Sequence, residues 1–191
     1  NFSKVDIPIV ITDRETDCVN SDVVLIDNRK GGYIATKYLI SLNHRRIGCI
    51  SGHSLILPST ERVEGYRDAL QEAGIEFDRN LWRKGNLRFD GGLSEMCALL
   101  SLQAPPTAIF ACNDMMALGA MRAIKDAGLS VPEDISVIGF DNTILSNFVF
   151  PELTTISQPI EEMADLTVEL LIEKINLKEG HKHQKAYTPM F

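Results

Sequence analysis

Short, almost wholly apolar runs alternate with amphipathic stretches along this chain, and this alternation constrains its fold more than any other feature. The clearest runs are Ile47–Ile50, Ala108–Ala111 and Ile135–Phe140. Continuous apolar character over so few residues is typical of central strands in a parallel sheet, because both faces of such strands are buried. Segments of about 12 residues with helical spacing separate the runs. The pattern predicts an α/β fold with parallel sheets flanked by helices.

The helical segments carry recognisable start and stop signals. Ile34, Tyr38 and Leu42 recur at helical spacing, so a helix is expected over residues 31–43 with Asn28 as its cap.

Four other residues mark the ends of later helices. Gly74 and Gly128 are expected to stop two of them, because glycine readily adopts the left-handed conformation that ends a helix. Asp90 is expected to cap a third helix, and Pro159 to occupy the first turn of the last one.

Composition excludes several classes of protein. With 191 residues and 45% hydrophobic content, the chain can bury a sizeable core. The formal net charge of −7 would repel a nucleic-acid backbone on average, so this segment is not expected to contact DNA itself. No apolar run approaches the roughly 18 residues that a membrane span needs, so no membrane partner is expected.

Four cysteines, Cys18, Cys49, Cys97 and Cys112, are widely spaced and form no C-x-x-C pair. Cys49 and Cys112 fall inside apolar strand-like runs. We therefore expect reduced, buried cysteines of a cytosolic protein, with disulfides as the less favoured alternative, and no metal site.

Polar residues gather where the predicted strands end. These ends read Asp13–Arg14, Ser51–His53, Asn113–Asp114 and Asp141–Asn142. Ligands of open parallel sheets bind beyond the carboxyl ends of the strands. Carboxylates accept hydrogen bonds from adjacent hydroxyls, and a guanidinium donates a fixed fork to their oxygens. A small polyol or sugar suits this set.

Each of these residues also has a plain structural interpretation. Asp114 fits a helix cap as well as a ligand contact, Asn142 fits a turn, and Asp13–Arg14 fits a surface ion pair. The sequence contains no nucleophile elbow, dinucleotide or phosphate loop, H-E-x-x-H motif or metal-spaced cluster of histidines and cysteines, and His181 and His183 lie on a charged loop where solvated side chains are expected. Neither an enzyme nor a bound cofactor is expected.

Several long motifs then point to one family. "VPEDISVIGFDN", "FPELTTISQP", "GGYIATKYLISLNHRRIGCISG", "ERVEGYRDALQEAGI" and "PTAIFACNDMMALGAMRAIKDAGLSVP" occur in this order. From about Ile7 to its end, the chain resembles the effector-binding domain of LacI/GalR (lactose-repressor) family transcription regulators. The resemblance implies a periplasmic-binding-protein-like fold of two Rossmann-like lobes, of which this chain holds one complete lobe and part of the other.

The resemblance also implies domain boundaries. Residues 1–26 are expected to form part of the N-terminal lobe and 27–157 the C-terminal lobe. Residues 158–180 would return to the N-terminal lobe as a helix, and 181–191 would form a final crossover and strand. A DNA-binding headpiece is expected to be missing from this chain.

Within the family, "GNLRFDGGLSEM" and "ERVEGYR" make the segment similar to ribose operon repressors. This similarity implies a ligand-binding set and no catalytic or metal-binding residues. The implied set is Asp13, Arg14, Arg62, Phe89, Asn113, Asp141 and Gln158. Leu87 competes with Phe89 for the place of an aromatic residue that covers one face of the sugar.

The implied protein is a cytoplasmic, homodimeric repressor whose effector is ribose or a related sugar and which binds operator DNA through the missing headpiece. A purine-responsive repressor is one alternative, although Ile56, Leu57 and Pro58 stand where purine-binding relatives place polar contacts. An exported sugar-binding protein of a transporter is the other.

Overall fold

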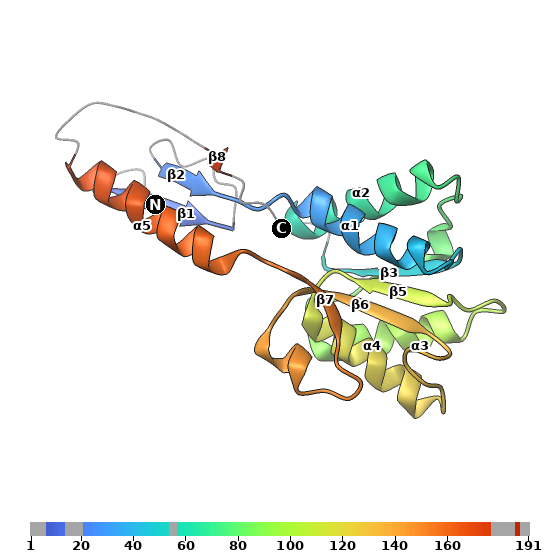
Figure 1. The fold of residues 1–191 in the computed structure, drawn as a ribbon. Coiled ribbons are helices and arrows are strands. Elements are labelled where there is room, and N and C mark those ends of the chain that lie inside the picture. The colour runs from blue at the N-terminus through green and yellow to red at the C-terminus, as the bar shows by residue number, and fades with distance from the viewer. Residues whose placement is uncertain (1–6, 14–20, 54–56, 177–185, 188–191) are drawn as a thin grey trace. The chain divides into compact units, whose positions relative to one another are not determined.

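The structure is a computed structural model that describes residues 7–13, 21–53, 57–176 and 186–187 (Figure 1). The chain divides into two compact units. Unit 1 comprises residues 1–27 and 158–191, and unit 2 comprises residues 28–157.

Unit 2 is built on a five-stranded sheet with the strand order β4-β3-β5-β6-β7, in which every neighbouring pair is parallel. The strands are β3 (Ile47–Ser51), β4 (Trp82–Lys84), β5 (Ala108–Ala111), β6 (Ser136–Asp141) and β7 (Thr154–Ser157). Short 3-10 helices, η2 (Arg79–Leu81) and η3 (Ile144–Asn147), precede β4 and follow β6.

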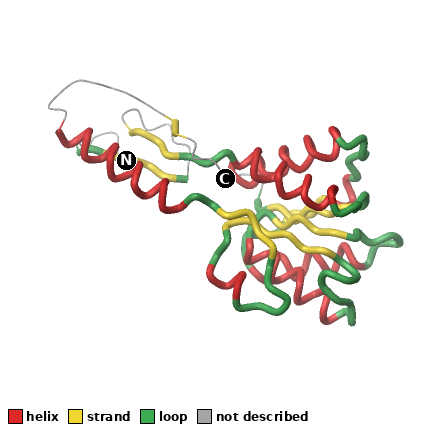
Figure 2. The backbone as a smooth tube through the Cα atoms, viewed as in Figure 1, coloured by secondary structure: helices red, strands yellow, loops and turns green. Residues whose placement is uncertain are grey.

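Four helices cover this sheet as two pairs. They are α1 (Asn28–Ser41), α2 (Leu57–Glu72), α3 (Phe89–Leu100) and α4 (Asp114–Asp126). The pair α1 and α2 covers one face of the sheet, and the pair α3 and α4 covers the other (Figures 1 and 2). The predicted arrangement of helices around a parallel sheet is confirmed.

The centre of the sheet is fully covered by these helices. All residues of β3 and β5 are buried, as their apolar character predicted. Tyr66 of α2 is also buried and donates its hydroxyl to the Ile47 carbonyl of β3 at 2.8 Å. Burial raises the pKa of the Tyr66 hydroxyl, so it stays protonated as the donor.

Reciprocal glycines hold each helix pair in close contact. A Cβ atom at Gly65 would lie 1.9 Å from the Arg29 carbonyl oxygen, and one at Gly32 would lie 2.1 Å from the Arg62 carbonyl oxygen. In the other pair, a Cβ at Gly119 would lie 2.1 Å from the carbonyl oxygen of Phe89. The helix backbones therefore touch directly at these crossings.

Unit 1 has a smaller parallel sheet with the order β1-β2-β8. Its strands are β1 (Ile9–Thr12), β2 (Ser21–Val24) and β8 (Ala186–Tyr187), and helix α5 (Ile160–Asn176) packs on β1 and β2. Lys174 of α5 lies 3.2 Å from the Asp22 carboxylate of β2. None of the helices in the described ranges is long and apolar enough to span a membrane.

The two predicted helix stops agree with the structure, but the predicted starts do not. Gly74 and Gly128 adopt φ angles of +66° and +77° just after their helices, as expected. Helix α1 begins at Asn28, which is therefore its first residue and not its cap, and α5 begins one residue after Pro159. The prediction that Asp90 caps a helix is wrong, because α3 already begins at Phe89 and Arg88 holds the cap position. Asp90 lies in the first turn instead, and its carboxylate accepts a hydrogen bond from the Asn86 amide.

Candidate functional site

The strand order fixes where a ligand site is expected in unit 2. From β3 the chain moves to one side to form β4 and then returns to the other side to form β5. The crevice beyond the carboxyl ends of two strands at such a reversal is the usual ligand site of an open α/β sheet. Gly52 follows β3 at this point, and Asn113 lies just beyond β5. Asp141 ends the neighbouring strand β6.

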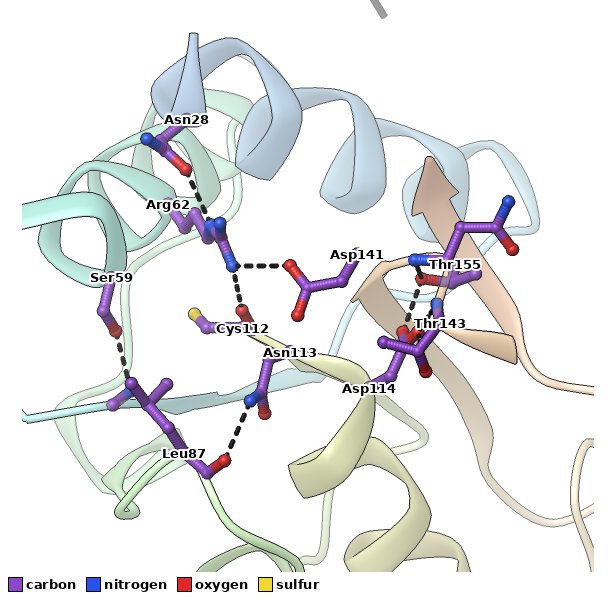
Figure 3. A network of polar contacts seen from close by, with 12 residues as sticks. Asn28, Ser59, Arg62, Leu87, Cys112, Asn113, Asp114, Asp141, Thr143 and Thr155 are labelled. Atoms are coloured by element: carbon purple, nitrogen blue, oxygen red, sulfur yellow. Dashed lines mark hydrogen bonds and ion pairs between the residues drawn. The ribbon is translucent and has the colours of Figure 1, made fainter. Parts of the chain in front are cut away.

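The central side chain of this region is Arg62, a buried residue of α2 (Figure 3). Its Nε donates to the Asn28 Oδ1 atom at 2.8 Å, and its Nη1 donates to the Cys112 carbonyl oxygen at 2.6 Å. The guanidinium carbon lies 3.6 Å from the ring centroid of Phe140. Two hydrogen bonds and a cation–π contact therefore fix the plane of the guanidinium.

Asp141 completes an ion pair with this guanidinium. Its Oδ1 atom lies 3.4 Å from the Arg62 Nη1 atom, and the Asp141 side chain keeps 26% of its surface exposed. The remaining guanidinium nitrogen, Nη2, forms no hydrogen bond with any residue that the structure describes. A charged donor and a partly exposed carboxylate thus stand side by side.

The third polar residue, Asn113, has two structural contacts. Its Oδ1 accepts from the Met116 backbone amide at 3.0 Å and so caps α4, while its Nδ2 donates to the Leu87 carbonyl at 2.9 Å. Leu87 itself has a positive φ of 63°, and its side chain lies where a Cβ of Gly52 would be. Asn113 therefore holds Leu87 at the same end of the sheet as Arg62 and Asp141 (Figure 3).

Phe89 does not join this cluster. It lines a separate groove of about 630 Å³ together with Leu118, Met121 and Leu129 at the α4 end and Phe150 beyond β6. The reason is local: the turn at residues 86–88 ends with Phe89 as the first residue of α3, and Leu87 takes the position next to Asn113. Of the two predicted candidates, Leu87 is the one that lies beside the polar residues.

Asp114 has a structural role that the sequence left open. The cap of α4 is Asn113, and the Asp114 carboxylate, fully buried, accepts hydrogen bonds from Thr143 and Thr155 instead. Asn142 has a φ of 53° and closes the turn that follows β6.

The predicted contacts of unit 1 are described only in part. Asp13 is exposed, follows β1 directly and has a φ of 57°. Arg14 lies outside the described residues. Gln158, partly buried, comes directly after β7. For these residues the ligand role stays a prediction.

Sequence reasoning missed several members of the cluster. Asn28 was predicted only as a cap and Phe140 only as a buried strand residue, and the Cys112 carbonyl was not predicted at all. The position of Phe140 before Asp141 is no signal of its contact with Arg62, because successive side chains of a strand point to opposite faces of the sheet. Nothing in the sequence marks a backbone carbonyl as an acceptor.

The chemistry of this cluster is that of binding. Arg62 offers charged donors, Asp141 offers charged acceptors, and Leu87 adds an apolar surface. Burial raises the pKa of the Cys49 thiol far from the range of a reactive thiolate. Among the described residues, no group of three or more histidine, cysteine, aspartate or glutamate side chains could hold a metal ion.

Comparisons with known proteins agree with this architecture. A family model described as a periplasmic binding protein-like domain matches residues 36–190. The chain is 40% identical over 177 residues to the HTH-type transcriptional repressor PurR of Vibrio atlanticus (strain LGP32), which covers 93% of this chain and 53% of that protein. It is 37% identical over 179 residues to the ribose operon repressor of Haemophilus influenzae, covering 93% and 54%. The chain thus spans about half the length of these relatives.

A solved structure gives the same result. The LacI family transcriptional regulator from Enterococcus faecium, with bound ribose, superposes with a TM-score of 0.82 at 31% identity. The match covers 95% of this chain and 67% of that one. These relatives are transcriptional regulators, and none of the three is named as an enzyme. The chain therefore belongs to the periplasmic binding protein-like domain family, in the form that LacI-family regulators carry as their effector-binding domain.

Proposed function

We propose that this chain binds the effector of a cytoplasmic, DNA-binding transcriptional repressor, and that the effector is a small sugar, ribose in the first place. The observation that carries the proposal is the cluster of Arg62, Asn113 and Asp141 at the point where the strand order reverses. Asp13, Arg14 and Gln158 are proposed as further contacts to the same ligand.

The hydrogen-bonding groups of the cluster favour a sugar. Asp141 can accept from two neighbouring hydroxyls, and the unused nitrogen of Arg62 can donate to a hydroxyl or ring oxygen. Leu87 can cover the apolar C–H face of a sugar ring. The ribose-bound structure and the ribose operon repressor among the relatives support the same class of ligand.

A purine is the rival effector, and the similarity to a PurR repressor favours it. A planar base would gain most from an aromatic ring to stack on. In this cluster, however, Arg62 covers the ring of Phe140, and Phe89 lines the separate groove. Leu57, at the start of α2, offers no polar side chain to a base.

Calorimetric titration of the 191-residue chain with D-ribose, and separately with guanine and hypoxanthine, tests the proposal. D-Ribose should bind, and Asp141→Ala should weaken its affinity at least about tenfold, because a charge-assisted hydrogen bond contributes about 1.5–3 kcal/mol. Asp126→Ala, which removes an exposed carboxylate at the far end of α4, is the matched control and should leave the affinity unchanged.

Two results would overturn the proposal. Binding of a purine without binding of ribose would reassign the effector. Equal ribose affinities for the wild-type chain and Asp141→Ala would remove the cluster from the site.

We further propose that the effector acts by favouring one relative arrangement of two lobes over another. Such a ligand can shift the equilibrium only by its difference in affinity for the two arrangements. A coupling of about 1–3 kcal/mol would change operator affinity by roughly 5- to 150-fold. Contact with DNA would come through a headpiece, because this segment carries a net charge of −7.

A homodimer is proposed from a second region of unit 2. Phe150 is 99% exposed and Phe148 is 77% exposed, an unusual state for two neighbouring aromatic side chains. Phe150 also borders the groove that Met121 and Leu129 line. In a twofold dimer each chain could place its Phe150 in the groove of the other, since such an interface is self-complementary.

Sedimentation velocity tests the dimer. The wild-type chain should sediment as a dimer, and Phe150→Asp should sediment as a monomer whose circular dichroism spectrum is that of the folded wild-type chain. A wild-type chain that stays monomeric at all concentrations, or a Phe150→Asp variant that stays dimeric, would refute this interface.

A further inference from the structure

We propose that Asp114 is a positioning residue: its buried carboxylate fixes the backbone turn at residues 141–143 and thereby aims the Asp141 side chain at the effector. The inference rests on the proposed function, because it assigns to Asp141 the ligand contact described above. Asp114 itself touches no ligand in this scheme.

The Asp114 carboxylate accepts three hydrogen bonds from residues far along the chain. Its Oδ2 atom accepts from the Thr143 backbone amide at 2.6 Å and from the Thr143 hydroxyl at 2.9 Å. Its Oδ1 atom accepts from the Thr155 hydroxyl at 2.6 Å. A single side chain at the start of α4 therefore ties together the loop after β6 and the middle of β7 (Figure 3).

The hydrogen bond from Thr155 to Asp114 also determines that Thr155 acts as the acceptor toward Asn142. Thr155 uses its only hydroxyl proton toward Asp114, so the oxygen lone pairs are left for the Asn142 backbone amide, which donates to it at 3.3 Å. The Asn142 side chain donates to the Ser157 hydroxyl at 3.1 Å. Asp141, directly before Asn142, is thus held from both sides of the turn.

The turn needs such support because its backbone is unfavourable. Asp141 has a φ of 114° and Asn142 a φ of 53°, although neither is glycine. Asparagine tolerates a φ near 53° better than most residues, but an aspartate at 114° lies outside the common regions and persists only where the surrounding structure imposes it. The unusual φ directs the Asp141 carboxylate from the strand end toward Arg62, which lies 3.4 Å away.

The neighbouring strand makes room for this arrangement. A Cβ atom at Gly139 would lie 2.5 Å from the Asp114 Oδ1 atom, so only glycine leaves space for the carboxylate beneath β6. A carboxylate whose sole task was to cap α4 would not need this space, and Asn113 already caps that helix. These contacts therefore indicate that Asp114 supports the turn at residues 141–143 and not the start of α4.

Asp114→Asn in the full chain is the first test, read by nuclear magnetic resonance without any ligand. An amide has one acceptor oxygen, so it cannot receive all three of these protons. The three-bond couplings that report φ at residues 141 and 142 should move toward ordinary negative values. The contact between the Asp141 and Arg62 side chains should weaken. Asp126→Asn on the same helix is the control and should change neither.

Thr155→Val is the second variant, used in case Asp114→Asn does not fold. It removes the hydroxyl that joins Asp114 to Asn142 and should shift the φ couplings of residue 142 in the same direction. Wild-type couplings at residues 141 and 142 in either folded variant would refute the positioning role.

A third test measures the affinity of the variants for D-ribose. Asp114→Asn should weaken ribose affinity about tenfold in the wild-type background and less than twofold in an Asp141→Asn background, because its effect passes through Asp141. Equal losses in the two backgrounds would show a general structural effect and overturn the inference. If the wild-type chain does not bind ribose, the proposed effector fails, whereas the couplings still decide the role of Asp114.

Discussion

Unit 2 presents two surfaces of opposite character: the polar cluster of Arg62, Asn113 and Asp141, and the apolar groove beside Phe150. In the cluster, charged groups are largely buried and held by hydrogen bonds and an ion pair, so their geometry is fixed before any ligand arrives. At the groove, Phe150 is almost fully exposed, and only its covering by another surface would remove it from water. Fixed polar geometry suits a small molecule, whereas exposed apolar area suits a protein surface.

The largest expected effect comes from the helix crossing that supports the cluster. Gly65→Ala should lower the free energy of unfolding by about 3 kcal/mol, because the new Cβ would lie 1.9 Å from the Arg29 carbonyl oxygen. Urea unfolding measures this loss. Gly119→Ala, at the crossing of α3 and α4 beside the groove, should cost a similar amount. Wild-type stability of Gly65→Ala would contradict the close contact of these helices.

Removing one arginine from the polar cluster and one from the groove should change the unfolding free energy by different amounts. Arg62→Met should cost about 2 kcal/mol of unfolding free energy, because it leaves the Cys112 carbonyl and the Asp141 carboxylate without their shared donor. Arg122→Met, which removes an exposed guanidinium at the groove, should change the stability by less than about 0.5 kcal/mol. Equal effects in denaturant titrations would mean that Arg62 is not held as described.

Aromatic rings on the two surfaces should also respond differently. Phe140→Leu should lower the unfolding free energy by about 1.5 kcal/mol, since the ring is buried and carries the Arg62 guanidinium on its face. Phe150→Leu, the same change on the exposed ring, should leave the stability of the monomer within about 0.5 kcal/mol of wild type. A thermal melt of both variants at a concentration that favours monomers tests the pair.

The smallest expected effect is a pH dependence of the stability, and it arises at the amino ends of the strands, opposite the polar cluster. His44 bridges the Thr107 and Ser136 hydroxyls at the amino ends of β5 and β6, and its burial lowers its pKa. The unfolded chain therefore takes up this proton more readily than the folded chain. Stability from this group is present above the ordinary histidine pKa of about 6.5 and declines as the pH falls below it. Unfolding curves at pH 7 and pH 5 should differ less in His44→Asn than in wild type.

The architecture of unit 2 followed from local signals. The apolar runs at Ile47 and Ala108 became central strands, and the glycines at 74 and 128 ended helices with the left-handed φ that glycine favours. These features depend on residues close in sequence, so their pattern can be read without knowing the fold.

The details of the site depend on contacts that the sequence does not display. Leu87 lies beside the polar cluster, and Phe89 lines the groove, because one turn at residues 86–88 orients them differently. The positive φ of Asp141 comes from bonds that Asp114 makes with Thr143 and Thr155, far away along the chain. Such long-range hydrogen bonds leave no periodic pattern in the residues that form them.

The glycine crossing of α1 and α2 has a mechanical consequence. At Gly32 and Gly65 the two backbones pack against each other without intervening side chains. A shift of one helix therefore cannot be taken up by side-chain rearrangement between them. The first residue of α1, Asn28, is also the residue at which the chain enters unit 2, and it is hydrogen-bonded to Arg62. A displacement of the Arg62 guanidinium should therefore move Asn28 as well, because α1 and α2 shift together as one rigid pair.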